Sequence, residues 1–261
     1  MRTDLQQLPA VSIAETLERA PGIVDLWCFF YERVAGDASL FAEYEAILSS
    51  EERDRHQRYR FERDRRQFLA TRALVRSVLS SYSATSPSDW RFALGERGKP
   101  RIAAPTTAVR PHFNLANTAG LVVCAVSLAH EVLGVDVERL DRTNDILALS
   151  DRYFCSSEAR SLRSLPTTAQ PRRFFDYWTL KESYIKAHGL GLAIPLDSFA
   201  FQVEGERIRI EFDERRDDDA TCWRFTLIDA PPRHLIAVGA DTGGAELSVR
   251  AKRVVPLREG K

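Results

Sequence analysis

The sequence lacks an excess of charge of either sign. Lysine plus arginine and aspartate plus glutamate each number 37 among 261 residues, so the formal net charge is zero. Proteins that act on long polyanions usually carry a basic excess, and nucleic acid is therefore not expected as the main partner. A small phosphorylated ligand, held by a local basic patch, stays compatible with this balance.

Long apolar runs are missing as well. No stretch approaches the roughly 20 apolar residues that a membrane span needs, and residues 1–22 lack the uninterrupted apolar core of a signal peptide. Cysteine and histidine are few, with four and five residues, and they form neither a CxxC pair nor a metal-ligand spacing. These absences predict a cytoplasmic enzyme that does not contact a membrane.

What the sequence does contain is two successive sets of helices and strands. The first set has a strand at 23–34, a helical region at 48–82, and strands at 90–94, 111–115 and 121–128. The second has a strand at 133–140, helical regions at 141–162 and 171–189, and strands at 199–203, 207–212, 222–228 and 234–240. This order predicts an α/β (α+β) fold with two related halves, residues 1–130 and 131–261, divided near 129–132.

Local signals predict several helix ends and one helix face. Ser49 with Glu52 three residues later predicts a capping box at the start of the first helical region. Gly189 predicts the end of the last helix. One apolar face of the first helical region is expected to consist of Phe61, Phe68, Val75 and Leu79.

The helix at 171–189 carries an acid on its apolar face. Phe175, Trp178, Glu182 and Ile185 follow steps of three, four and three, which is the spacing of one helix face. Burying an unpaired charge costs several kcal/mol or more, so Glu182 needs a cation, a metal or an aqueous cleft. The alternative is a solvated i,i+4 pair with Lys186, worth about 0.2–0.5 kcal/mol. Because a solvated pair need not interrupt an apolar stripe, a functional role is favoured.

The stretch "GVDVE", residues 134–138, places two carboxylates on one face of a strand. Asp136 and Glu138 lie roughly 6.6 Å apart along the strand axis, close enough to converge on one cation. Oxygen ligands alone select a hard ion such as Mg²⁺. The alternative is a half-buried strand whose polar face is in water, and the pattern taken alone favours that alternative.

Basic and small polar residues offer candidate phosphate ligands. Arg58, Arg65 and Arg72 recur at steps of seven, and Lys99 lies in "RGKPR"; arginine binds phosphate with two parallel hydrogen bonds. For Arg58 and Arg65 individually, a solvated helix face is the favoured interpretation, whereas Arg72 lies on an apolar stripe and is the better candidate. The stretch 113–120, "FNLANTAG", is predicted as a polar loop whose amides approach a phosphate. Residues 215–221, "RRDDDAT", are predicted as a solvated loop.

Taken in this order, the pieces resemble the 4′-phosphopantetheinyl transferases of the Sfp type. That family has an arginine-rich helix, then G-K-P, F-N-x-S-H-S, G-(I/V)-D-(I/V)-E and W-x-x-K-E-(S/A)-x-x-K. This sequence has "RFERDRRQFLATRALVR", "GKP" (98–100), "FNLANT" (113–118), "GVDVE" (134–138) and "WTLKESYIK" (178–186). The match runs from about residue 25 to residue 240, and its last two motifs are the most specific.

The resemblance implies an α/β fold of two subdomains related by a pseudo-twofold axis. Each would be a small antiparallel sheet packed with helices, with the active site in the cleft between them. The implied reaction depends on Mg²⁺, or alternatively Mn²⁺, and moves 4′-phosphopantetheine from coenzyme A (CoA) to a serine hydroxyl of an acyl or peptidyl carrier protein. Adenosine 3′,5′-bisphosphate is released. Two fused halves favour a monomer.

The resemblance also implies roles for particular residues. Asp136, Glu138 and Glu182 would hold the metal, and Glu182 would also accept the proton of the serine. Lys186 would stabilise the pyrophosphate, and Glu158 would help to position the base. The residues implied to contact CoA are Arg65, Arg72, Lys99, Pro100, Asn117, Thr118, Asp136, Lys181 and Lys186.

One motif departs from the family pattern. Where many members have Ser-His-Ser, this chain has Ala116, Asn117 and Thr118. Histidine can offer a positive charge to phosphate, whereas asparagine offers only a neutral amide donor. We therefore expect weaker affinity for CoA or a compensating contact, without loss of activity.

Two other functions compete with the transferase. A non-catalytic CoA- or nucleotide-binding module of the same fold would be expected to have lost a carboxylate or the lysine, yet Asp136, Glu138, Glu182 and Lys186 are all present. A metal-dependent phosphohydrolase would be expected to carry a His-rich or multi-Asp cluster. The sequence contains no such cluster.

Overall fold

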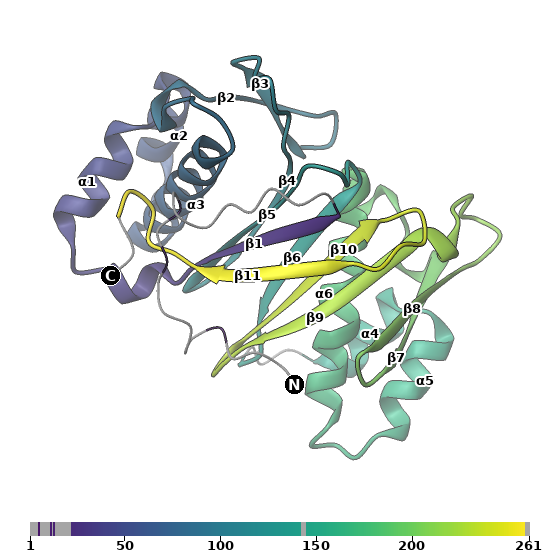
Figure 1. Cartoon of the computed structure of the whole chain (residues 1–261). Coiled ribbons are helices and arrows are strands. Elements are labelled where there is room, and N and C mark those ends of the chain that lie inside the picture. Colours follow the sequence, from purple (N-terminus) through teal and green to yellow (C-terminus); the bar gives the residue numbers. More distant parts are fainter. Residues whose placement is uncertain (1–4, 6–10, 12, 14–21, 142–144, 259–261) are drawn as a thin grey trace.

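The computed structural model describes residues 5, 11, 13, 22–141 and 145–258 (Figure 1). Its first sheet has four strands in the order β11-β1-β5-β4. Strands β1 (Ile23–Phe29), β5 (Leu121–Ser127) and β4 (His112–Thr118) pair antiparallel, whereas β11 (Ser248–Arg253) runs parallel to β1. The sequence pattern did not predict β11, which completes the sheet that the N-terminal strand begins.

The second sheet is antiparallel, in the order β6-β10-β9. It consists of β6 (Leu133–Arg139), β9 (Trp223–Ala230) and β10 (His234–Asp241). Two hairpins flank the sheets, β2 (Arg91–Leu94) with β3 (Pro100–Ala104) and β7 (Phe199–Glu204) with β8 (Arg207–Phe212). The predicted α/β fold with small antiparallel sheets is confirmed. The division at 130/131 stays a prediction, and β11 crosses it.

The two sheets lie between two groups of helices (Figure 1). One group is α1 (Ala38–Ala46), α2 (Ser50–Arg58) and α3 (Glu62–Ser81), and the other is α4 (Ile146–Tyr153), α5 (Ser156–Ser164) and α6 (Gln170–His188). Short 3₁₀ helices lie at Tyr31–Val34, Pro87–Asp89, Gly191–Ala193, Leu196–Ser198 and Ala220–Cys222.

Side chains alternate in direction along the strands, and the buried apolar ones form three clusters. In β1, Trp27 packs in the cluster that α3 covers, whereas its neighbour Leu26 points into the cluster between the two sheets. Val135 of β6 enters that same central cluster, and Leu235 of β10 packs in the cluster of α6. Because successive strand residues face opposite sides, each sheet buries both faces. The central cluster therefore holds the two sheets together.

The first helical region is two helices with a break between them. The predicted capping box is confirmed, because the Ser49 hydroxyl accepts from the Glu52 amide at 3.3 Å and the Glu52 carboxylate accepts from the Ser49 amide at 3.2 Å. Phe61, expected on the buried face, precedes α3 and is 52% exposed, so that expectation is wrong. Tyr59 packs on Phe68 with ring centroids 5.4 Å apart; nine residues of continuous helix would separate them by about 13.5 Å.

The stretch 113–120 is mostly strand, and the prediction of a polar loop is wrong. Strand β4 runs to Thr118, which pairs with Leu121, so only a two-residue turn remains. Gly120 in that turn has a φ of +91°, which glycine adopts without strain. Asn114 is buried and its Oδ1 accepts from the backbone N–H of Val135 at 2.9 Å. A polar side chain that finds such a partner does not interrupt a strand.

Helix α6 rests directly on strand β6. A Cβ atom added to Gly134 would lie 1.9 Å from the carbonyl oxygen of Ser183, so only glycine permits this approach. The predicted C-terminal signal is confirmed, because Gly189 ends the helix with a left-handed φ of +69°. The predicted helical region 141–162 is divided into α4 and α5, and its residues 142–144 lie outside the described ranges.

No helix in the described part of the chain is long and apolar enough to cross a membrane.

Candidate active site

A cleft of about 830 Å³ opens where α3, β4, β6 and α6 meet. Strand β4 belongs to the first sheet and β6 to the second, so the cleft lies at the junction of the two sheets. The structure thereby brings together residues that are up to 119 positions apart, from 67 to 186. Six of the predicted site residues line this cleft: Asn117, Thr118, Asp136, Glu138, Glu182 and Lys186.

An ion pair joins β6 to α6 at the floor of the cleft. The ammonium of Lys186 lies 2.5 Å from Oδ1 of Asp136, whose side chain is 5% exposed. Burial by itself would lower the pKa of Lys186, but the attraction of Asp136 outweighs it and raises the pKa. The second carboxylate oxygen of Asp136, Oδ2, is buried and has no hydrogen-bond partner in the described structure.

Glu182 is held in an environment that disfavours its charge. Burial, together with the nearby carboxylates of Asp136 and Glu138, raises its pKa to about 7, although Lys186 opposes the shift. A carboxyl group with this pKa exchanges protons near neutral pH, which is the property of a general base or acid. Trp178 lines the same cleft one turn earlier on α6.

The three carboxylates suit a hard divalent cation. Among the described residues, no group of three or more histidine, cysteine, aspartate or glutamate side chains already has the arrangement of a metal site. The donor set nevertheless consists only of carboxylate oxygens, which Mg²⁺ and Mn²⁺ prefer. The unpartnered Oδ2 of Asp136 is a buried acceptor that a bound cation would satisfy. These residues therefore fit such an ion.

A smaller hollow of about 260 Å³ adjoins the cleft, and Gln67 and Asn117 line both. Arg55, Arg72 and Asp64 also line the hollow, so positive charges outnumber negative ones in its lining. The Arg72 guanidinium stacks over Phe68 at 5.3 Å, and its Nε lies 3.4 Å from Glu52. These contacts fix the position of the Arg72 side chain in the wall of the hollow. The sequence predicted Arg72 as a phosphate ligand, and this stays a prediction.

Lys99 and Pro100 lie elsewhere, in a second pocket of about 580 Å³ just past the end of α6. The Lys99 ammonium donates to the carbonyl oxygens of Ala187 at 2.7 Å and Leu133 at 3.2 Å. Burial lowers its pKa. The structure therefore does not bring Lys99 and Pro100 into the cleft of Asp136 and Glu182.

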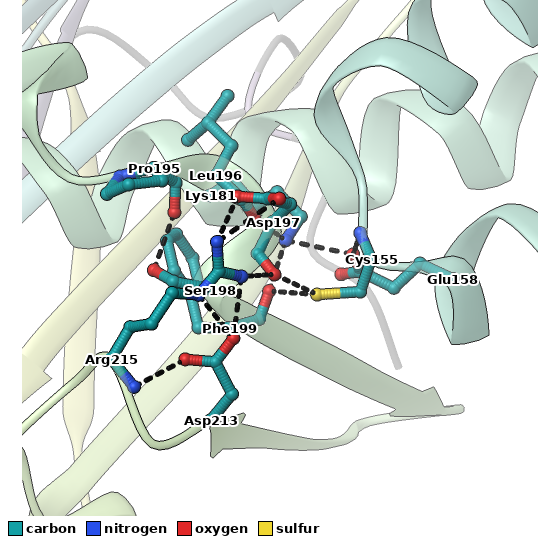
Figure 2. Close-up of polar contacts among 10 residues, drawn as sticks. All are labelled: Cys155, Glu158, Lys181, Pro195, Leu196, Asp197, Ser198, Phe199, Asp213 and Arg215. Carbon is teal, nitrogen blue, oxygen red and sulfur yellow. Dashed lines mark hydrogen bonds and ion pairs between the residues drawn. The ribbon is translucent and has the colours of Figure 1, made fainter.

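Lys181 does not face any phosphate site, and its predicted contact with CoA is wrong. Its side chain is fully buried. Its ammonium donates to the carbonyl oxygens of Leu196 at 2.7 Å and Phe199 at 2.5 Å and lies 2.8 Å from Glu158 (Figure 2). An ammonium has three donors, so this one has no donor left for a ligand.

Glu158 is the partner of Lys181 in this buried ion pair and does not line the cleft. Its carboxylate also accepts from the backbone N–H groups of Phe201 at 2.9 Å and Cys155 at 3.1 Å. Burial raises the pKa of Glu158, and Lys181 opposes that shift. Because Lys181 precedes Glu182 on α6, Glu158 is placed to fix the helix that presents Glu182.

Arg65 is 41% exposed and lines neither the cleft, the hollow nor the second pocket. Its Nε donates to the carbonyl oxygen of Tyr59 at 2.9 Å, across the break between α2 and α3. The structure gives Arg65 this local role, and its predicted contact with CoA has no support in the geometry.

The sequence pattern did not reveal two kinds of residue: those that line the cleft without belonging to a motif, and a loop residue that contacts the end of α6. Gln67 and Arg139 line the cleft, but no motif marks them; Gln67 is one position in an arginine-rich helix, and only the tertiary contact with Asn117 distinguishes it. Asp218 is part of the predicted solvated loop, yet it accepts from Tyr184 at 2.7 Å and lies 3.1 Å from His188. That prediction is wrong at Asp218, which ties the loop to the end of α6.

Comparison with known proteins identifies the family of this chain. A profile of the 4′-phosphopantetheinyl transferase superfamily matches residues 132–239, and a profile of the 4′-phosphopantetheinyl transferase N-terminal region matches residues 37–129. The 4′-phosphopantetheinyl transferase HetI of Nostoc is 39% identical over 57% of this chain and 62% of its own length. The 4′-phosphopantetheinyl transferase Sfp of Bacillus subtilis is 31% identical over 75% of this chain and 83% of its own length.

Among solved structures, holo-acyl-carrier-protein synthase of Thermotoga maritima aligns with 41% of this chain and 61% of its own, at 19% identity and a TM-score of 0.34. The cleft combines carboxylates with a lysine at the junction of two sheets, and such a set of side chains is suited to a divalent cation and to phosphate groups. The chain belongs to the 4′-phosphopantetheinyl transferase superfamily, as its motifs predicted, and is an enzyme of that class.

Proposed function

We propose that the protein transfers 4′-phosphopantetheine from CoA to a serine hydroxyl of an acyl or peptidyl carrier protein. The observation that carries the proposal is the cleft that places Glu182 and Glu138 beside the Asp136–Lys186 ion pair. The serine oxygen forms a bond to the phosphorus that bears the pantetheine. The bond from that phosphorus to the bridging oxygen breaks, and adenosine 3′,5′-bisphosphate leaves.

Glu182 is the proposed general base. Its carboxylate accepts the proton of the serine hydroxyl, which makes the oxygen a better nucleophile. Lys186 is the proposed electrostatic stabiliser, since its ammonium stays charged and neutralises the pyrophosphate oxygens as the bond breaks. Glu158 and Lys181 support the reaction only indirectly, through the position of α6.

Asp136, Glu138 and Glu182 are the proposed ligands of a Mg²⁺ or Mn²⁺ ion. Such an ion would neutralise charge on the pyrophosphate, as metal ions do in phosphoryl transfer. Occupancy of the site would also remove the repulsion that the three carboxylates exert on one another. The all-oxygen donor set and the unpartnered Oδ2 of Asp136 support this assignment.

The peripheral phosphate contacts are assigned to the hollow beside the cleft. Arg72 supplies the charge there, and Asn117 supplies neutral donors. Thr118 lies at the rim of the cleft and can donate its hydroxyl. Lys99 and Pro100 remain proposed contacts for a more distant part of CoA, in the second pocket.

We further propose that the protein acts as a monomer in the cytoplasm. One chain supplies every group of the proposed site, because both sheets contribute residues to the cleft. Light scattering coupled to size-exclusion chromatography measures the oligomeric state, and a dimer at low micromolar concentration would contradict the proposed monomer.

The direct test is to incubate the protein with CoA, Mg²⁺ and an apo carrier protein and to weigh the carrier by mass spectrometry. We expect a mass gain of one phosphopantetheine group. Glu182→Gln should lose transfer by about 10²-fold or more while its circular dichroism spectrum stays unchanged. No mass gain with several fatty-acid, polyketide and peptide-synthetase carriers would refute the proposal, and an unfolded Glu182→Gln protein would make the glutamate structural.

A further inference from the structure

A line of hydrogen bonds runs from the β4–β5 turn to the hollow of Arg72. The buried backbone N–H of Gly120 donates to the hydroxyl of Tyr31 at 2.9 Å. That hydroxyl lies 3.4 Å from Oε1 of Gln67, and Nε2 of Gln67 donates to Oδ1 of Asn117. Nδ2 of Asn117 lies 3.5 Å from the hydroxyl of Thr71, which lines the hollow.

The bonds in this line run in one consistent direction. The backbone N–H of Gly120 donates to the Tyr31 oxygen, and the Tyr31 hydroxyl donates to Oε1 of Gln67. The NH₂ group of Gln67 then donates to Oδ1 of Asn117. Because Asn117 accepts through Oδ1, its NH₂ group faces the other way, toward Thr71 and the hollow.

Thr71 reinforces this orientation. Its hydroxyl donates to the backbone carbonyl of Gln67 at 2.7 Å, so toward Asn117 it offers only lone pairs. The charged groups around the hollow are Arg55, Arg72 and Asp64, and Tyr59 also lines it. An anion bound there would meet two guanidinium groups and the NH₂ of Asn117.

We propose that Tyr31 and Gln67 are positioning residues that hold the Asn117 amide with its NH₂ group toward a phosphate of CoA in this hollow. The proposal rests on the proposed function. A histidine offers positive charge at this position, but asparagine presents either a donor or an acceptor, depending on a flip of its amide. The flipped amide would point oxygen at phosphate and repel it. Fixing the amide is therefore the compensating contact that the Asn117 departure requires.

Isothermal titration of CoA into the full-length protein is the first test. Gln67→Met keeps the length of the side chain but removes both hydrogen bonds, and we expect it to weaken CoA binding about tenfold. Gln57→Met, an exposed glutamine on α2, is the matched control and should leave the affinity unchanged. Melting temperatures of the variants show whether they are folded.

A double-mutant cycle separates positioning from direct contact with the ligand. If Gln67 acts through Asn117, then Gln67→Met should have no further effect in an Asn117→Ala background. Losses that add would mean that Gln67 touches CoA itself, which would overturn the proposal. In the transfer assay, Gln67→Met should raise KM for CoA with kcat within about twofold, because the contact is equal in ground and transition states.

Two outcomes keep this proposal apart from the proposed function. If the wild-type protein does not bind CoA at all, the proposed function fails, and so does the proposed positioning of Asn117 by Tyr31 and Gln67 (the relay). If the wild type binds CoA and Gln67→Met binds it equally well, only the relay is refuted. Tyr31→Phe gives an independent arm, in which a folded variant should also bind CoA more weakly, and unchanged affinity there would exclude Tyr31 from the relay.

Discussion

The chemistry of Glu182 is set by its neighbours more than by its residue type. It lies on α6 with Phe175 and Ile185 buried on the same face, while Asp136 and Glu138 approach it from β6. Burial and like charge both favour its protonated form. The apolar stripe of the helix thus opens into the cleft at this one position, and the pKa of Glu182 rises to about 7 as a consequence.

This shift predicts a pH-dependent stability of the metal-free protein. Glu182 ionises with a pKa near 4.5 in the unfolded chain and about 7 in the folded protein, so folding binds a proton and stability falls as the pH rises through that interval. Glu182→Gln removes this loss. The melting temperature of Glu182→Gln minus that of the wild type should therefore be larger at pH 8 than at pH 5, when both are measured in the presence of EDTA. An equal difference at both pH values would show that Glu182 does not titrate there.

At the scale of elements, α6 is the part that brings the site together. It is fixed at three places: by Gly134 of β6 beneath it, by the buried Glu158–Lys181 pair beside it, and by Asp218 near its end. Removing one partner of a buried ion pair leaves an uncompensated charge, so the Glu158–Lys181 pair holds α5, α6 and β7 in one arrangement. The helix can then present Glu182 and Lys186 with little freedom.

The close approach of α6 to β6 gives a prediction for Gly134. Gly134→Ala places a methyl group 1.9 Å from the Ser183 carbonyl oxygen, and the helix must move away, at a cost of about 1–3 kcal/mol or more. We expect a lower urea midpoint and a loss of transfer activity, because Glu182 and Lys186 move with the helix. Gly36→Ala is the control, since nothing lies within 4 Å of its added Cβ. Equal midpoints for the two variants would argue against the tight contact.

At the scale of the whole molecule, the cleft exists because two sheets are joined along β4 and β6. The central apolar cluster supplies most of the contact, and Asn114 adds a directed link through its bond to the Val135 amide. Strand β11 ties the C-terminal end of the described chain to β1. Relative movement of the two sheets would change the distance between Asn117 and Glu182, and these links restrain that movement.

Asn114 provides the prediction at this scale. Asn114→Ala leaves the buried Val135 N–H without a partner, which should cost about 1–3 kcal/mol in the free energy of unfolding. Hydrogen exchange of the β6 amides should also become faster, because β6 loses its link to the first sheet. Asn117→Ala, an exposed asparagine on the same strand, should leave both quantities nearly unchanged. A stability loss as large at Asn117 as at Asn114 would contradict the linking role.

Local pattern by itself determined strand β6 and helix α6, the helix ends at Ser49 and Gly189, and the apolar stripe that Glu182 interrupts. These features depend on residues close together in the sequence, where periodicity and capping act. The tertiary structure alone decided that Lys181 is buried, that β11 joins the first sheet and that Gln67 meets Asn117. Each of these depends on a contact between distant segments, and a local pattern holds no information about which segment will supply the partner.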